Sequence, residues 1–179
     1  KFSFKIKIFN DIEPRLLQIG TSHNKNLKNL ILAIKDIKCV LVIIGKINEN
    51  IFNFLKLNFI KFENYVDIDE PELIKQYESA DIITFVSTYE GFGMPIIEAN
   101  AIGRCVITSN CTSMPEIANN AACLVDPFSI NSIKDGVLKI CNNQIYRQNL
   151  IDNGIINAKR FDKDKIHKQY LTLYKKINH

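Results

Sequence analysis

The residues best suited to chemistry lie in one segment, STYEGFGMPIIEAN, which runs from Ser87 to Asn100. It follows an apolar, strand-like run and opens a helix, in which proline suits the first turn because its missing N–H needs no acceptor there. Gly91 and Gly93 let the backbone make a tight approach. The free amide groups around Phe92, Gly93 and Met94, together with the helix dipole, would point at a phosphate. The segment therefore predicts an anion site at the end of a strand.

Two glutamates flank this phosphate cradle. Glu90 precedes the glycines and Glu98 lies about one turn into the helix, so seven residues separate them and both can face one crevice. A carboxylate accepts two hydrogen bonds side by side, which suits the vicinal hydroxyls of a ribose or a hexose. Simpler explanations exist: a glycine pair can merely turn the chain, Glu98 could be a favourable charge near a helix N-terminus, and Glu90 a solvated loop residue.

Alternating strands and helices must position this segment, because short apolar runs recur between stretches with helical spacing. The strands are expected at Arg15–Gly20, Cys39–Gly45, Ile60–Val66, Asp81–Val86, Cys105–Ser109 and Ala122–Val125. The helices are expected at Asn26–Ile37, Glu49–Leu57, Glu70–Ser79, Pro95–Ile102, Met114–Asn119, Ser129–Cys141, Gln144–Lys159 and Lys163–Ile177. These strands are too apolar to expose one face to water. We therefore predict an α/β fold with a doubly wound, open parallel sheet of the Rossmann-like type.

Ligands bind to such sheets at the carboxyl ends of the strands. The functional residues should therefore lie in the loops that follow Gly20, Gly45, Val66, Val86 and Ser109. The segment with the two glutamates follows the fourth of these strands, which places it at this edge.

Composition argues against several classes of protein. The chain has 179 residues, 46% hydrophobic and 23% charged, as expected for a globular protein of one domain. No apolar run approaches the roughly 20 residues that span a bilayer. The net charge of +4 comes from scattered lysines, which argues against nucleic acid as a partner. The five cysteines form no CxxC pair and predict reduced thiols in a cytoplasm, and the three histidines have no metal-ligand spacing.

The two ends of the chain carry separate expectations. Residues 1–14 include the alternating run KFSFKIKI, and we expect an interdomain strand or linker there, ahead of a domain over residues 15–160. Residues 161–179 are expected to form a C-terminal helix whose apolar face consists of Ile166, Tyr170, Leu173 and Tyr174. This helix could lie on a membrane surface, but docking on its own sheet is the favoured interpretation. Because the chain opens with Lys and not Met, we expect a piece cut from a longer protein.

The segment with the two glutamates resembles a known family. Two glutamates separated by seven residues mark the C-terminal, donor-binding domain of retaining GT-B glycosyltransferases of family 4, also called group 1. The similarity covers nearly all of Arg15–Ile133, through LLQIGTSHNKNLKNLILAI, NYVDIDEPELIKQYESADIITFVSTYEGFGMPIIEANAIGRCVITSNCTSMPEI and ACLVDPFSINSI. It implies the C-terminal half of a GT-B fold, with the acceptor-binding N-terminal domain missing. It also implies sugar transfer with retention, from a nucleotide diphosphate sugar to a glycan or lipid-linked acceptor, in cell-surface polysaccharide synthesis.

The resemblance also assigns roles to individual residues. Glu98 would bind the ribose hydroxyls of the nucleotide sugar. Glu90, the expected catalytic residue, would sit beside the transferred sugar and hydrogen-bond it. Lys25 would neutralise the diphosphate, with Gly20 allowing close approach.

Further substrate contacts are implied around the same crevice. The backbone of Gly91, Phe92, Gly93 and Met94 would hold the sugar and the distal phosphate. The backbone around Tyr65 and Val66 would lie against the edge of the nucleobase. Ser113 resembles a position near the crevice, or it could cap the helix that follows it.

One position departs from the family pattern. Many members have Arg directly after the first-loop glycine, whereas this chain has Thr21, and His23 and Asn24 stand where Pro-Arg is common. Lys25 is therefore the single cation that we expect at the diphosphate. Oriented N–H donors and this lysine would stabilise the negative charge of the leaving group, so we expect no metal ion and no cofactor.

Other interpretations remain open. A glycosidase would use Glu90 and Glu98 as acid and nucleophile, but the phosphate cradle and Lys25 would then have no role. Any doubly wound sheet can hold a nucleotide, so the chain could be a non-catalytic nucleotide-binding module, or a donor subunit that needs a separate acceptor-binding partner. For the transferase we expect a cytoplasmic location, with peripheral contact at the inner face of the cell membrane in the full-length enzyme. The isolated domain should be inactive.

Overall fold

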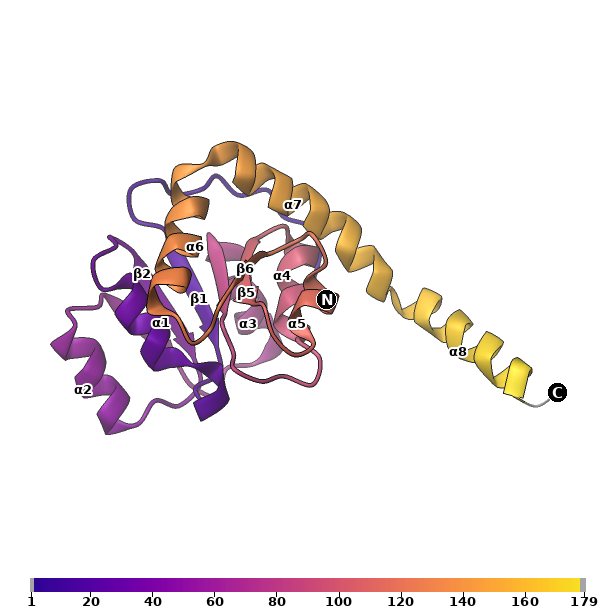
Figure 1. Ribbon diagram of the computed structural model, residues 1–179, viewed down its shortest axis with the longest axis horizontal. Coiled ribbons are helices and arrows are strands. Elements are labelled where there is room, and N and C mark those ends of the chain that lie inside the picture. Colours follow the sequence, from indigo (N-terminus) through magenta and orange to yellow (C-terminus); the bar gives the residue numbers. More distant parts are fainter. Residues whose placement is uncertain (1, 178–179) are drawn as a thin grey trace.

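The computed structural model describes residues 2–177 and contains one open sheet of six parallel strands (Figure 1). The strands are β1 (Arg15–Ile19), β2 (Val40–Ile44), β3 (Phe62–Tyr65), β4 (Ile82–Phe85), β5 (Cys105–Ser109) and β6 (Cys123–Val125). Their order across the sheet is β3-β2-β1-β4-β5-β6. Each strand lies within a predicted run, so the parallel sheet is confirmed.

The helices also follow the predicted segments closely. They are α1 (Leu27–Ile34), α2 (Glu49–Leu57), α3 (Glu70–Ser79), α4 (Met94–Ile102), α5 (Met114–Ala118), α6 (Ile130–Asn142), α7 (Gln144–Ala158) and α8 (Lys163–Ile177). Two short 3₁₀ helices, η1 (His23–Lys25) and η2 (Lys159–Phe161), were not expected. Single turns are too short to show an apolar periodicity, so the sequence pattern does not predict them.

Helices cover both faces of the sheet, because successive strand side chains point to opposite sides. Leu16 of β1 belongs to a buried cluster with residues of α1, α2 and α6. The next residue, Leu17, belongs to a second cluster with residues of α3, α4 and α5. The fold is therefore doubly wound, as the apolar strands predict.

The strand order reverses between β1 and β4, the two central strands. The chain leaves β1 toward α1 on one face of the sheet and leaves β4 toward α4 on the other face. The helices that follow these two strands consequently lie on opposite faces of the sheet. A crevice outside the carboxyl ends of such strands is where open α/β sheets bind ligands.

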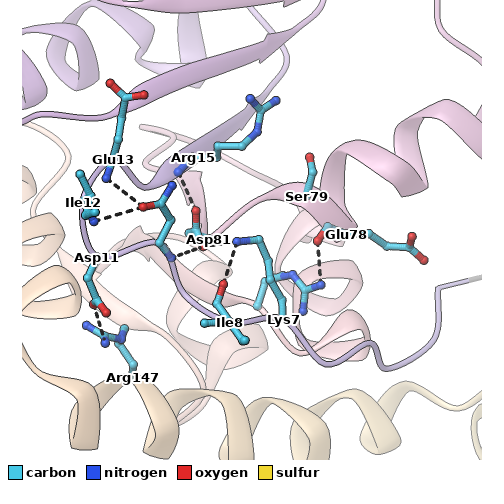
Figure 2. A network of polar contacts seen from close by, with 12 residues as sticks. Lys7, Ile8, Asp11, Ile12, Glu13, Arg15, Glu78, Ser79, Asp81 and Arg147 are labelled. Carbon is cyan, nitrogen blue, oxygen red and sulfur yellow. Dashed lines mark hydrogen bonds and ion pairs between the residues drawn. The ribbon is translucent and has the colours of Figure 1, made fainter.

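Residues 2–14 were expected to form an interdomain strand or a linker, and the structure has no strand there. This segment is irregular and lies along the amino ends of the central strands, held by side chains of the domain (Figure 2). The buried Asp81 carboxylate pairs with Lys7, and the Arg104 guanidinium donates to the Lys5 carbonyl oxygen at 2.8 Å. Alternation favours a strand only where a neighbouring strand offers a row of backbone partners, and here the Lys5 amide donates to the Ile102 carbonyl oxygen at 3.1 Å while side chains supply other partners. A linker role for the segment stays a prediction.

The terminal helix corrects one expectation. No residue of α8 is buried, and the helix projects away from the sheet (Figure 1). Tyr170, Leu173 and Tyr174 of its apolar face are 51–58% exposed. The expected docking of α8 on the sheet is therefore wrong; α7 packs on α4 instead, with Gly154 against Asn100. Residues 1, 178 and 179, which complete the two predicted end segments, lie outside the described residues.

No helix within residues 2–177 combines the length and the apolar content that crossing a bilayer requires.

Candidate functional site

The loop after β1 carries the predicted cation. Gly20 ends the strand with a φ of +85°, a conformation that favours glycine, and η1 then brings Lys25 back over it. A Cβ on Gly20 would lie 3.0 Å from Cε of Lys25, so a larger residue would push the lysine away. The Lys25 ammonium also lies 4.7 Å from the centre of the Phe85 ring, at the end of β4. The glycine therefore allows the lysine to approach the neighbouring strand.

The loop after β4 meets this lysine. The Glu90 carboxylate lies 2.7 Å from the Lys25 ammonium, and both side chains are mostly buried. Asn24 adds two side-chain hydrogen bonds, to the Tyr89 carbonyl oxygen at 3.0 Å and to the Glu90 carboxylate at 3.3 Å. The backbone joins the loops too, since the Thr88 amide donates to the Asn24 carbonyl oxygen at 2.8 Å. The two loops at the strand-order reversal thus form one unit.

Ser113 supports this unit from the loop after β5. Its hydroxyl oxygen lies 3.0 and 2.8 Å from the carbonyl oxygens of Glu90 and Phe92, and its one hydrogen can be donated to either. It makes no side-chain cap bond to the amides of α5, so the capping interpretation is wrong. Its backbone is already helical, with φ −77° and ψ −18°, whereas a capping residue is typically extended. Ser113 instead holds the glycine loop in place through its contacts with the loop's carbonyl oxygens.

The glycine loop leads into α4 as predicted. Gly93 is the N-cap residue with a φ of +116°, and a Cβ there would lie 3.1 Å from the Ile96 side chain. Gly91 has open space where a Cβ would stand. Within residues 2–177, the backbone amides of 91–94 donate no hydrogen bond. Gly91, Phe92 and Met94 are exposed residues, whereas Gly93 is buried, so the donors of 91, 92 and 94 belong to residues that an anion can reach from solvent.

Glu98 has a different environment from Glu90. It lies in the second turn of α4 and accepts a hydrogen bond of 2.6 Å from the Tyr77 hydroxyl of α3. Burial raises the pKa of this carboxyl group, the hydrogen bond from Tyr77 lowers it, and the nearby Glu70 raises it. The two glutamates are therefore held by different elements, Glu90 by the loop after β1 and Glu98 by α3.

The predicted nucleobase edge lies at the end of β3. The Tyr65 carbonyl oxygen accepts from the Gly45 amide at 2.8 Å, and its hydroxyl donates to Glu63 at 3.0 Å. Val66 follows the strand and is 43% exposed. Both residues stand at the carboxyl edge of the sheet, two strands away from the loop that carries Lys25.

Three side chains of this site carry no signal in the sequence. Asn24, Thr112 and Tyr77 contact the loop or the glutamates, and each is an ordinary residue of its local element. The Thr112 hydroxyl accepts from the Glu90 amide at 3.4 Å, and its φ of +54° is unusual for threonine. Only the packing of distant segments reveals these contacts.

The arrangement combines a lysine, a helix N-terminus with free amides, and two carboxylates. The lysine and the amides can bind a phosphate, and the carboxylates can accept hydrogen bonds from sugar hydroxyls. Among the residues that the structure describes, no group of three His, Cys, Asp or Glu side chains converges as metal ligands do.

Comparison with known proteins identifies the family. The model of the glycosyl transferases group 1 family matches residues 1–157. The chain belongs to this family. Its fold is that of the C-terminal half of GT-B glycosyltransferases, so the expected fold class is confirmed.

Relatives and solved structures of glycosyltransferases agree. The chain is 34% identical over 118 residues to O-antigen chain mannosyltransferase B of Escherichia coli, a match covering 65% of this chain and 30% of the relative. The C-terminal domain of the group 1 glycosyltransferase LpcC from Francisella tularensis superposes with a TM-score of 0.70 at 23% identity, covering 83% of this chain and 85% of that one.

HepE of Anabaena, solved in complex with UDP-glucose, superposes with a TM-score of 0.79 at 16% identity. That match covers 92% of this chain and 49% of HepE. The chain thus spans less than half of the longer enzymes to which it is similar.

Proposed function

We propose that this glycosyltransferase chain binds a nucleotide diphosphate sugar in the crevice between the loops after β1 and β4. One observation carries the proposal: the strand-order reversal brings Lys25 within 2.7 Å of Glu90, beside the free amides at the start of α4. Phosphate-binding groups and a hydroxyl-binding carboxylate then stand side by side, as a sugar joined to a diphosphate requires.

The diphosphate would lie between Lys25 and the N-terminus of α4. The lysine is paired with Glu90, and a diphosphate would compete for the same ammonium group. As the bond between the anomeric carbon and phosphate breaks, negative charge grows on the leaving group. The lysine and the amides around Gly93 would stabilise that charge, and they supply the positive potential that a metal ion would otherwise provide.

The two carboxylates would divide the sugar hydroxyls between them. Glu98, deeper along α4, would accept from the ribose hydroxyls. Glu90 would hydrogen-bond the transferred sugar and act on the transition state as that sugar becomes cationic. The backbone beside Tyr65 and Val66 would lie against the edge of the nucleobase.

The proposal also covers the reaction that the whole enzyme would catalyse. The relatives include a mannosyltransferase of O-antigen chains, which supports transfer in polysaccharide synthesis. The related structure of HepE holds UDP-glucose, which supports a nucleotide sugar as donor. We propose retention of configuration, a separate acceptor-binding half, a glycan or lipid-linked acceptor, and a cytoplasmic enzyme with peripheral membrane contact.

Calorimetry with UDP, GDP and ADP, each with and without EDTA, tests donor binding. At least one of these diphosphates should bind, and chelation should leave its affinity unchanged. Loss of binding on chelation would contradict the metal-independent site. If neither these diphosphates nor their glucose and mannose conjugates bind, the proposed function is wrong.

A transfer assay tests the division into halves. Residues 1–179 alone should bind donor without turning it over, because no acceptor is positioned for attack. Transfer of sugar to any glycan or lipid acceptor by this chain alone would show that the sheet carries its own acceptor site.

A further inference from the structure

Tyr77 is a large polar side chain that the mechanism above does not use. It lies on α3 with no exposed surface, and its hydroxyl donates to the Glu98 carboxylate at 2.6 Å. Its ring is part of the buried cluster under α3, α4 and α5. The Phe2 ring contacts it edge-on, with 5.1 Å between ring centres. The ring is thus enclosed, which fixes the position of the hydroxyl.

A fixed hydroxyl orients the carboxylate that it contacts. A buried tyrosine hydroxyl requires a hydrogen-bond partner, and among the described residues it donates to Oε2 of Glu98. Because that oxygen is held, the carboxylate cannot rotate freely about its last side-chain bond. Oε1 and the remaining acceptor sites of Oε2 accept no hydrogen bond that the structure shows among the described residues, so they are left for a ligand.

The same contact affects the charge of Glu98. Burial raises the pKa of this carboxyl group, and Glu70 of α3 raises it further, whereas the hydrogen bond from Tyr77 lowers it. Tyr77 therefore favours the ionised form, which accepts hydrogen bonds from two vicinal hydroxyls. A protonated Glu98 would be a poorer acceptor.

We propose that Tyr77 is a positioning residue that holds the Glu98 carboxylate in the orientation and charge state that binds the ribose of the donor. The inference rests on the proposed function, in which Glu98 contacts ribose. Tyr77 itself does not touch the donor, because its side chain is fully buried beneath α4.

The experiment compares four proteins: the parent, Tyr77→Phe, Glu98→Gln and the double variant. Calorimetry with UDP, GDP and ADP first selects the diphosphate that binds the parent most tightly. Glu98→Gln should weaken that diphosphate about tenfold, and Tyr77→Phe about three- to tenfold. The double variant should bind like Glu98→Gln alone, because Tyr77 acts through the carboxylate.

A pH profile separates positioning from a structural role. Tyr77→Phe should move the acid-side loss of affinity to higher pH, because Glu98 loses the hydrogen bond that favours its ionised form. Glu98→Gln should lack this step. Tyr146→Phe is the matched control, since Tyr146 packs against the other face of the sheet. It should bind the diphosphate like the parent at every pH.

Distinct outcomes overturn the inference and the proposed function. If Glu98→Gln weakens the diphosphate while Tyr77→Phe binds like the parent with the same pH profile, the positioning role is wrong and the donor site stands. Additive losses in the double variant would also overturn it, because Tyr77 would then act independently of Glu98. If Glu98→Gln binds like the parent, the ribose contact fails and the inference fails with it.

Discussion

The amino and carboxyl edges of the sheet both gather charged side chains but satisfy them differently. At the amino edge, the Asp81 carboxylate is 1% exposed and accepts from Lys7 and from the amides of Asn10 and Arg15 (Figure 2). At the carboxyl edge, the Glu90 carboxylate accepts from two side chains of the neighbouring loop, Asn24 and Lys25, and from no other group within residues 2–177. The free amides of 91–94 stand beside it.

This difference indicates that the charges at the amino edge stabilise the fold, whereas those at the carboxyl edge can bind a ligand. At the amino edge, Arg147 donates to two carbonyl oxygens and to Asp11, and Arg104 donates to four carbonyl oxygens. A charge with this many protein partners resists movement and has little left to offer a ligand; of the Arg104 guanidinium, Nε alone is buried without a partner among the described residues. Groups that keep unused donors or acceptors can exchange protein partners for a ligand. We therefore expect changes at the amino edge to alter stability and changes at the carboxyl edge to alter binding.

The largest expected effect is at the amino edge. Asp81→Ala should lower the free energy of unfolding by about 3–5 kcal/mol, because it leaves Lys7 and two backbone amides without their buried acceptor. Urea unfolding measures this change, and nucleotide affinity of the folded variant should stay unchanged. Asp152→Ala, an exposed aspartate on α7, is the control and should cost less than about 0.5 kcal/mol. A variant that loses nucleotide binding while keeping its stability would contradict the separation.

The next effect is on binding at the carboxyl edge. Glu98→Ala should weaken a free nucleoside diphosphate and its sugar conjugate alike, by about 1.5–3 kcal/mol, the usual contribution of a charged hydrogen bond. Titration calorimetry measures both ligands. Glu49→Ala, an exposed glutamate on α2, should bind both like the parent. Equal affinities in Glu98→Ala and the parent would place the ribose elsewhere.

A smaller and more selective effect is expected at Glu90. Glu90→Ala should weaken the nucleotide sugar by about 1 kcal/mol, because it removes a hydrogen bond to the sugar. The free diphosphate should bind as well as before or more tightly, since the Lys25 ammonium loses its protein partner. The ratio of the two affinities is the measurement. Equal weakening of both ligands would mean that Glu90 contributes to the shape of the loop and not to sugar binding.

The smallest expected effect tests whether ion pairing or burial makes the larger contribution to stability at the amino edge. Arg15 and Glu63 form a bidentate pair at 2.6 and 2.9 Å, with side chains 27% and 38% exposed. The hydrogen bonds from Arg15 lower the pKa of Glu63. The pair therefore adds stability above the ordinary glutamate pKa and loses it as the pH falls through the lowered value.

Glu63→Gln should consequently cost about 0.2–1 kcal/mol at pH 7, and the difference from the parent should vanish in acid. Urea unfolding at both pH values measures it. A loss at pH 7 as large as that of Asp81→Ala would show that ion pairing, and not burial, dominates this edge.

The sequence by itself determined the elements and the edge at which the candidate site lies. Apolar runs predicted the strands, and the order Gly93, Met94, Pro95 predicted the start of α4 to within one residue. These signals are local, since strand and helix patterns repeat over a few residues and a glycine or proline restricts its own backbone. The parallel sheet followed because runs this apolar need cover on both faces.

Only the tertiary structure decided which of these residues meet. Lys25 and Glu90 are 65 positions apart, and they touch because β1 and β4 are neighbours in the sheet. The partner of Glu98 was settled by the packing of α3 on α4, and the tertiary structure also decided that α7, and not α8, packs on α4. The physical reason is the same in all three cases. The sequence neighbours of each side chain do not depend on the order of the strands, so a local sequence pattern cannot predict which distant residues come into contact.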